Sequence, residues 1–281
     1  MQDPDNYIGW NSPEEITWIL DQGNDFPRLY WQVSSGTPLS AETLEDYLAG
    51  NGTENQSYLI ETAEQLNVIG LFPEYWDQNY FLVADVNLLP FTGTEFNRIG
   101  VNYGMPFTGT FDGDQHRILN FTYSANGYES NVGLFGYGFN CTIKNLGFED
   151  LYVSSLTSDI GGLIGYLRQG TMTQCFTSGT VTGISDSVYL GGLAGHNYSS
   201  HILKCNSTVN VSGHQYIGGL LGYNYRGTVE ACYSEGSVDG NNYIGGLVGY
   251  NFRYGIISDS FSSCLYPYPL SRQKLQVFKV D

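Results

Sequence analysis

Histidines and cysteines are the residues of this chain that could carry metal chemistry. The four histidines, His116, His196, His201 and His214, lie in different local contexts, and none belongs to a His-Glu-x-x-His arrangement that binds catalytic zinc. The five cysteines include no Cys-x-x-Cys pair. The sequence therefore predicts no zinc site.

The best candidate for a cation site is Asp112-Gly113-Asp114. Carboxylate oxygens are the ligands that calcium prefers, but no third acidic residue lies near Asp112 and Asp114 in the sequence. An ordinary β-turn, in which an aspartate accepts backbone amides, is the favoured alternative. We expect no other cofactor.

No catalytic signature stands out. The chain has no Gly-x-Ser-x-Gly elbow, no phosphate-binding glycine loop and no dinucleotide fingerprint. Asp85, Asp112 and Arg117 are the nearest approach to a cluster of charged residues that could act together. We assign no catalytic residue and expect a protein that is not an enzyme, although the sequence leaves this open.

A repeat organises the second half of the chain, and it must position the histidines, cysteines and charged residues named above. The phrase Gly-Leu-x-Gly begins at Gly133, Gly162, Gly192, Gly219 and Gly246, at intervals of 29, 30, 27 and 27 residues. Each copy opens a unit of three short strands bounded by Gly and Asn, which tolerate the positive φ of a tight corner. This pattern predicts an all-β fold in which the coils of a parallel β-helix stack about 4.8 Å apart.

The five phrases resemble the GLUG motif of bacterial and archaeal surface proteins, which is also found beside the catalytic domains of immunoglobulin A-specific metallopeptidases. The resemblance covers residues 130–263. It implies a right-handed parallel β-helix within an exported, often adhesive, multi-module protein that is secreted or held at the cell surface. The implied function is non-catalytic adhesion, through a glycan or a host or matrix protein.

Two enzymatic alternatives stay open beside adhesion. Polysaccharide lyases and hydrolases also use parallel β-helices, so the fold alone does not separate them from binding modules. The chain could also be an accessory region of a secreted peptidase. An enzyme would require carboxylates that converge in one groove.

One position of the repeat predicts a column of small side chains. The residue thirteen places after the first glycine is Leu146, Cys175, Cys205 or Cys232 in the first four copies, and an extra residue near Tyr254 moves it to Ser260 in the fifth. Residues at one position of successive coils stack, which indicates an inward structural ladder. A disulfide between neighbouring coils is the alternative, and reduced thiols are favoured.

Two aromatic columns follow the motif. The first comprises Tyr137, Tyr166, His196, Tyr223 and Tyr250, and the second comprises Phe139, Tyr198, Tyr225 and Phe252, with Leu167 and Arg168 near its place in the second copy. An outward strip for sugar rings or protein partners would make Tyr198, Tyr223, Tyr225, Tyr250 and Phe252 the candidate binding residues. Inward stacks that fill the coil are the alternative, which the sequence favours slightly.

The remaining segments suggest an order of parts along the chain. Residues 1–32 contain Trp10, Trp18 and Trp31, and residues 18–31 resemble the segment that closes a repeat block in such multi-module proteins. The resemblance implies the end of a preceding module, and an aromatic cap is the alternative. Residues 33–57 suggest a linker. Residues 58–129 suggest an N-terminal cap and first coil, with a helix from a capping box at Thr62 and Gln65 to about Leu71 that covers the open end of the β-helix. Residues 264–281 suggest a C-terminal cap or a truncated end.

The net charge of -17 is concentrated in the leading half, where residues 1–129 contain 19 acidic and 3 basic residues. Such a surface repels a phosphate backbone, so nucleic acid is not an expected partner. The sequence contains no run of about 18 apolar residues, so no membrane span is expected.

Overall fold

The computed structural model describes residues 43–125, 127, 129–184 and 187–266, together with the backbone of three short strands before residue 43. Those strands are β1 (Trp18–Leu20), β2 (Arg28–Leu29) and β3 (Thr37–Pro38), and they form an antiparallel sheet in the order β2-β1-β3. They belong to a separate compact unit, Met1–Asp46, which ends in the 3-10 turn Leu44–Asp46. The predictions for residues 1–32 and for the end of the chain after residue 266 lie outside the residues whose side chains are described.

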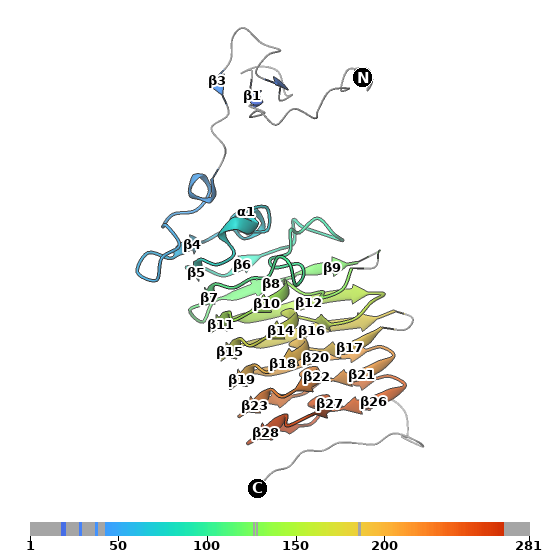
Figure 1. Cartoon of the computed structure of the whole chain (residues 1–281). Helices are drawn as coiled ribbons and strands as arrows, with labels where there is room; N and C mark the ends of the chain where they lie inside the picture. The colour runs from blue at the N-terminus through green and yellow to red at the C-terminus, as the bar shows by residue number, and fades with distance from the viewer. Residues whose placement is uncertain are drawn as a thin grey trace. The chain divides into compact units, whose positions relative to one another are not determined.

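The second unit is a parallel β-solenoid, so the predicted β-helix is confirmed. Figure 1 shows its strands stacked coil upon coil. The eight-stranded sheet contains β4 (Tyr58–Ile60), β5 (Asn79–Leu82), β7 (Thr110–Asp112), β11 (Thr142–Lys144), β15 (Thr171–Thr173), β19 (His201–Leu203), β23 (Thr228–Glu230) and β28 (Ile256–Ser258). In the three-residue strands from β7 onward the central side chain, such as Ile143 or Met172, points into the core while its neighbours face outward. In β4, by contrast, the central Leu59 is exposed and its neighbours Tyr58 and Ile60 are buried.

Three further sheets complete the coils. The nine-stranded sheet contains β6 (Val86–Asn87), β8 (Arg117–Leu119), β9 (Thr122–Ser124), β12 (Gly147–Ser155), β16 (Phe176–Gly183), β20 (Asn206–Ser212), β24 (Tyr233–Ser234), β25 (Val238–Asp239) and β29 (Phe261–Ser262). The five-stranded sheet contains β10 (Phe135–Phe139), β14 (Ile164–Arg168), β18 (Ala194–Tyr198), β22 (Leu221–Tyr225) and β27 (Val248–Phe252). The four-stranded sheet contains β13 (Ile160–Gly161), β17 (Val188–Gly191), β21 (Gln215–Gly218) and β26 (Asn242–Gly245).

The corners of the coils are not made by the motif glycines, which corrects the expectation from the sequence. Left-handed residues recur at three places per coil; at one of them they are Asn140, Gln169, Ser199, Arg226 and Arg253. The motif glycines instead allow neighbouring coils to approach. A Cβ atom on Gly222 would lie 2.4 Å from the backbone nitrogen of Leu190, and one on Gly195 would lie 2.5 Å from that of Ile160.

A ladder of buried asparagines runs inside the five-stranded sheet. The amide of Asn197 donates to the side-chain oxygen of Asn224 at 2.9 Å, and Asn224 donates to Asn251 at 2.7 Å. Each amide also donates to the backbone of the next corner, as Asn224 does to the carbonyl of Gly227 at 3.0 Å. These bonds join successive coils side chain to side chain, in addition to the backbone ladder.

A helix covers the first coil, as predicted. Helix α1 (Ala63–Ile69) begins at a capping box in which the Thr62 hydroxyl accepts the Gln65 amide hydrogen, and its Leu66 and Ile69 are fully buried. It ends at Ile69 rather than near Leu71, and a 3-10 turn (Pro73–Tyr75) follows. In Figure 1, α1 lies over the end of the solenoid formed by β4 and β5.

Residues 47–57, part of the segment interpreted as a linker, fold back onto this cap. Leu48 is buried, and Ala49 pairs with Leu59 in an antiparallel bridge. The backbone carbonyl of Gly52 also accepts the amide hydrogen of Asn79 at 2.8 Å. These residues therefore extend the N-terminal cap.

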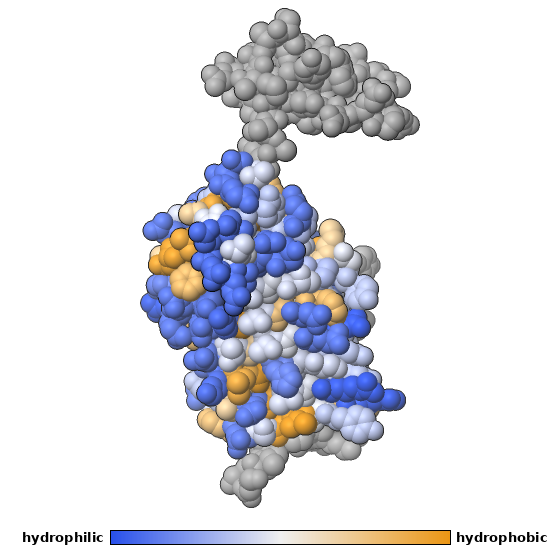
Figure 2. Space-filling model, turned by 60° about the vertical axis from the view of Figure 1, so that its left-hand side comes forward, coloured by the Kyte–Doolittle hydropathy of each residue, from blue (hydrophilic) through white to orange (hydrophobic). Residues whose placement is uncertain are grey.

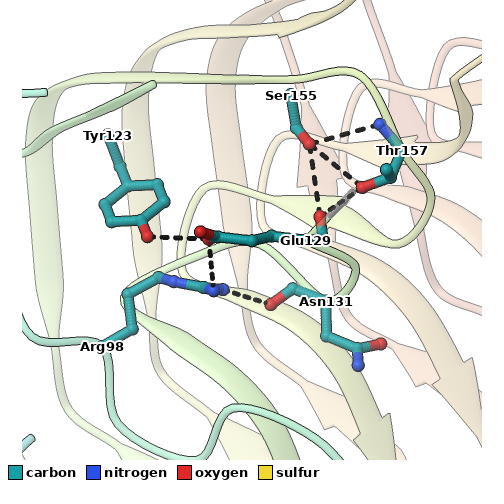
Figure 3. Close-up of polar contacts among 6 residues, drawn as sticks. All are labelled: Arg98, Tyr123, Glu129, Asn131, Ser155 and Thr157. Carbon is teal, nitrogen blue, oxygen red and sulfur yellow. Dashed lines mark hydrogen bonds and ion pairs between the residues drawn. The ribbon is translucent and has the colours of Figure 1, made fainter. Parts of the chain in front are cut away.

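An ion pair between a buried arginine and a partly exposed glutamate joins the cap to the first repeat coil (Figure 3). The Arg98 side chain, 7% exposed, donates to the Glu129 carboxylate at 2.9 Å and to the Asn131 carbonyl at 2.7 Å. The Tyr123 hydroxyl donates to the same carboxylate at 2.9 Å, and the hydroxyls of Ser155 and Thr157 donate to the Glu129 carbonyl. This network fixes the entry to the first Gly-Leu-x-Gly copy, because an unpaired buried guanidinium would be strongly unfavourable.

We expect Gly222→Ala to destabilise the solenoid. Its new Cβ would contact the backbone atoms of the preceding coil, which cannot rotate away as a side chain could. We expect a loss of about 3 kcal/mol, measured as a lower midpoint in chemical denaturation. Gly127→Ala is the control, because a Cβ there has no atom within 4 Å; equal losses from both substitutions would contradict the close-approach role.

Candidate binding surface

The proposed calcium ligand Asp112 is engaged within the protein. Its Oδ1 accepts hydrogen bonds from the Asp114 amide at 3.0 Å and the Asn145 side chain at 2.9 Å, and its Oδ2 lies 3.0 Å from Lys144 Nζ. Burial opposes ionisation, but these hydrogen bonds and Lys144 hold the pKa of Asp112 below its usual value. No group of three His, Cys, Asp or Glu residues converges anywhere in the described part of the chain. Calcium binding remains a prediction, and the contacts favour the turn.

Asp85 and Arg117 come together, whereas Asp112 pairs elsewhere. The Asp85 carboxylate accepts the backbone amide of Arg117 at 2.8 Å and its guanidinium at 2.9 Å, and it lies 3.5 Å from His116 Nδ1. Glu149 lies 3.5 Å from the other side of the guanidinium. The pKa of Asp85 is lowered, mainly by the Arg117 backbone hydrogen bond, whereas a general acid needs a raised pKa. The geometry describes an ion pair between coils.

The predicted column of small side chains lies in the core. Leu146, Cys175, Cys205 and Cys232 are almost fully buried, and Ser260 continues the column. The amide of Cys175 points to Cys205 Sγ at 3.5 Å, that of Cys205 to Cys232 Sγ at 3.4 Å, and that of Cys232 to Ser260 Oγ at 2.9 Å. All five cysteines are free thiols. Burial raises the pKa of Cys205, and it raises that of Cys141, which lies outside the column, to about 12.

The first aromatic column faces outward, so the inward alternative favoured by the sequence is wrong. Tyr137, Tyr166, His196, Tyr223 and Tyr250 lie in register across the five-stranded sheet. The residues that follow them in the strands, Leu167, Asn197 and Asn224, are fully buried and occupy the interior. Adjacent strand residues point to opposite faces, which turns the aromatic rings outward, where most are half-buried.

The second column also faces outward. It contains Phe139, Arg168, Tyr198, Tyr225 and Phe252, in register on the same five strands. The rings of Tyr198 and Tyr225 stack with centroids 4.8 Å apart and planes 13° apart. Arg168 replaces a ring in the second coil, and its guanidinium carbon lies 5.6 Å from the Phe139 centroid and 5.4 Å from the Tyr198 centroid.

A third column, which the sequence analysis missed, lies on the four-stranded sheet. Tyr189, Tyr216 and Tyr243 all have left-handed backbones, with φ of 63°, 56° and 55°. Their rings stack at 5.0 and 4.7 Å, and Tyr189 contacts Tyr223 of the first column at 4.9 Å. The available signal was a tyrosine three residues before the first motif glycine in each of the last three copies. We call these three outward columns together the tyrosine face.

His196 is the one histidine in the first column, and an acidic residue holds it. Its Nδ1 lies 3.0 Å from Asp159 Oδ1, and its ring centroid lies 4.2 Å from Tyr166 and 4.8 Å from Tyr223. Asp159 occupies the corner that tyrosines take in the next three coils. The pair fixes the imidazole plane within the stack.

The tyrosine face presents ring edges and hydroxyl groups. Most ring faces within a column are covered by the next ring, as in Tyr216 and Tyr243, whose planes differ by 8°. Burial raises the pKa of Tyr223 to about 12 and also raises that of Tyr166. The phenols of Tyr223 and Tyr166 therefore stay protonated at neutral pH, and a protonated phenol can donate a hydrogen bond. The side of the molecule drawn in Figure 2 carries its hydrophobic residues in small separate groups between hydrophilic ones.

Comparison with known proteins agrees with this repeat geometry. The family model for the GLUG motif matches residues 186–212, 213–239 and 240–263. These coils are GLUG repeats. The two earlier Gly-Leu-x-Gly copies lie outside these matches, and they pair in register with the matched coils through β10 and β14.

The chain has similarity to three further proteins. It is 31% identical over 149 residues to halomucin from Haloquadratum walsbyi, and the match covers 52% of this chain and 2% of halomucin. A crystal structure from Bacteroides ovatus, of a protein proposed to be an immunoglobulin A1 protease, superposes with a TM-score of 0.63 at 23% identity, over 83% of this chain and 81% of that one. An IgA1 protease structure gives a TM-score of 0.49 at 14% identity, over 86% of this chain and 22% of that one. The Bacteroides similarity is one of fold.

In the described residues no helix has the length and apolarity needed to cross a membrane.

The buried thiols should be inert in the folded protein. We expect a thiol reagent to react slowly with the native chain at pH 8, and fast with all five cysteines in denaturant, because the thiolate is the reactive form. Between about pH 8.5, where an exposed thiol ionises, and the raised pKa of Cys141 at about 12, only the unfolded chain loses this proton. The free energy of unfolding should therefore fall as pH rises through this window. Fast stoichiometric labelling of the native chain would contradict the buried ladder.

Proposed function

We propose that this chain is a non-catalytic GLUG module of a secreted or cell-surface protein, and that its tyrosine face binds a glycan or a protein partner. The observation that carries the proposal is the third column, Tyr189, Tyr216 and Tyr243, whose backbones are left-handed. A bulky side chain in this conformation is strained by about 1 to 2 kcal/mol.

The fold itself does not require tyrosine at this corner. The first two coils make the same turn with Asn131 and Asp159, residue types that adopt a left-handed backbone more readily. The later coils thus retain an unfavourable residue where a favourable one fits. Backbone strain that stability does not explain is typical of functional sites.

Tyrosine is well suited to recognition. It offers a large, rigid contact area at a small entropic cost and ends in a hydroxyl that can donate or accept a hydrogen bond. Stacking within the columns holds these rings in place before any ligand arrives, as for Tyr216 between Tyr189 and Tyr243. A pre-organised surface loses less entropy on binding.

Other observations support an extracellular localisation and a non-catalytic role for this chain. The names of the similar proteins, a mucin and a protease of an immunoglobulin, refer to molecules found outside cells. The similarity to the Bacteroides protein is also compatible with an accessory region beside a peptidase. The carboxylates best placed for catalysis, Asp85 and Asp112, are paired with Arg117 and Lys144.

The double variant Tyr216→Asn/Tyr243→Asn separates binding from folding. We expect its free energy of unfolding to stay within about 1 kcal/mol of the parent, since relief of strain offsets the lost ring contacts. Binding to an immobilised panel of glycans and matrix proteins should fall at least about tenfold.

Tyr233→Thr is the matched control, because Tyr233 stacks on Phe261 at 5.5 Å on the nine-stranded sheet, away from the tyrosine face. Binding that survives the double variant, or that falls equally in the control, would contradict the assignment of this face. Turnover of a polysaccharide by the parent chain would overturn the non-catalytic role.

A further inference from the structure

Arginine is concentrated on one side of the tyrosine face, although the chain as a whole carries a net charge of -17. The arginines in residues 130–266 are Arg168, Arg226 and Arg253. Arg168 belongs to the second column, and Arg226 and Arg253 follow directly after its members Tyr225 and Phe252. A single stripe therefore carries every arginine of the described repeat coils.

Aromatic rings position these guanidinium groups. The guanidinium carbon of Arg168 lies between the rings of Phe139 and Tyr198, and it is 5.4 Å from the ring of Tyr103. Arg226 lies 5.3 Å from the ring of Tyr225, and Arg253 lies 5.6 Å from that of Phe252. The second column thus uses ring faces to hold cations, and those faces are not free to stack on a sugar.

The stripe differs from the other arginines with described side chains in having no acidic partner. Arg98 pairs with Glu129 and Arg117 with Asp85, whereas within the described residues none of the three stripe arginines has a carboxylate within ion-pair distance. The acidic residue on the tyrosine face, Asp159, is paired with His196. Three positive charges are therefore left without an internal counter-ion.

The first residues of the adjoining strands do not supply one either. Beyond this corner the strands β15, β19 and β23 begin with Thr171, His201 and Thr228, none of which is acidic. Arg226 and Arg253 are exposed, so their N–H groups can reach a ligand. Arg168 is half-buried and its Nε is fully buried, which leaves only its terminal guanidinium nitrogens for a ligand. The planar fork of each guanidinium matches a carboxylate or a sulfate.

Resting on the proposed function, we infer that this arginine stripe binds an acidic glycan, with its carboxylate or sulfate groups on Arg168, Arg226 and Arg253. The charges follow the coil axis, with Arg226 and Arg253 one coil apart at about 4.8 Å, which suits an extended polymer whose acidic groups repeat. The phenol hydroxyls of the adjacent first column, such as Tyr223 and Tyr250, can bond the hydroxyl groups of the same chain.

The test measures binding of the full chain to three immobilised polysaccharides: one sulfated, one rich in uronic acid and one neutral. The parent should bind at least one acidic polymer and not the neutral one, and the affinity should fall as NaCl is raised from about 0.05 M to about 0.3 M. Arg226→Gln/Arg253→Gln should weaken binding about tenfold, and Arg226→Lys/Arg253→Lys should recover only part of it, because a lysine keeps the charge without the fork. Preference for one acidic polymer then identifies carboxylate or sulfate as the recognised group.

Lys204→Gln is the matched control, since Lys204 is an exposed cation at a different corner of the coil that precedes that of Arg226. Equal loss in this control, equal binding of the neutral polymer, or tighter binding of a single-stranded oligonucleotide would each overturn the inference. If binding to a neutral glycan or a protein depends on Tyr216 and Tyr243 but not on the arginines, the proposed function stands and this inference fails.

Discussion

The parallel stacking of coils is the constraint on which the rest of this structure depends. Each strand pairs in register with the equivalent strand of the next coil, so any side chain lies against the side chain at the same position one coil away. Backbones can approach this closely only where a Cβ is absent, as at Gly195 and Gly222. The motif glycines therefore set the distance between coils. The other positions must hold side chains that stack on the equivalent side chain of the next coil.

The ladders inside and outside the coils are two solutions to this constraint. Asn197, Asn224 and Asn251 stack because an amide both donates and accepts, so Asn224 accepts from Asn197 and donates to Asn251, while the buried Asn197 Oδ1 at the start of the ladder accepts no hydrogen bond from the described residues. Earlier coils fill the same interior position with Leu167 or leave it to Gly138, so the asparagines are not required by the motif. On the outside, tyrosines of successive coils stack through their rings, as Tyr198 does on Tyr225.

The repeat interval and the capping box were sufficient to predict the solenoid and the helix over its end. The direction of the aromatic columns could not be predicted from simple alternation along the strand. Ile164 and Leu167 both point inward although they are three positions apart, and alternation would place them on opposite faces. The third column was missed since a left-handed tyrosine contradicts backbone preference, and polar Asn197 gives no sign that it is buried. The pairing of His196 with Asp159 joins residues 37 positions apart, which local patterns do not reveal.

The near-translational repeat of the outer columns has a consequence for any chain-like ligand. A surface that presents similar groups at every coil has no unique starting point, so a polymer can sit at several offsets of nearly equal free energy. Those equivalent placements add statistical weight to the bound state, and a bound polymer can shift by one coil without releasing all contacts at once. Duplication of a coil would lengthen such a binding surface by one repeat and leave the existing contacts unchanged.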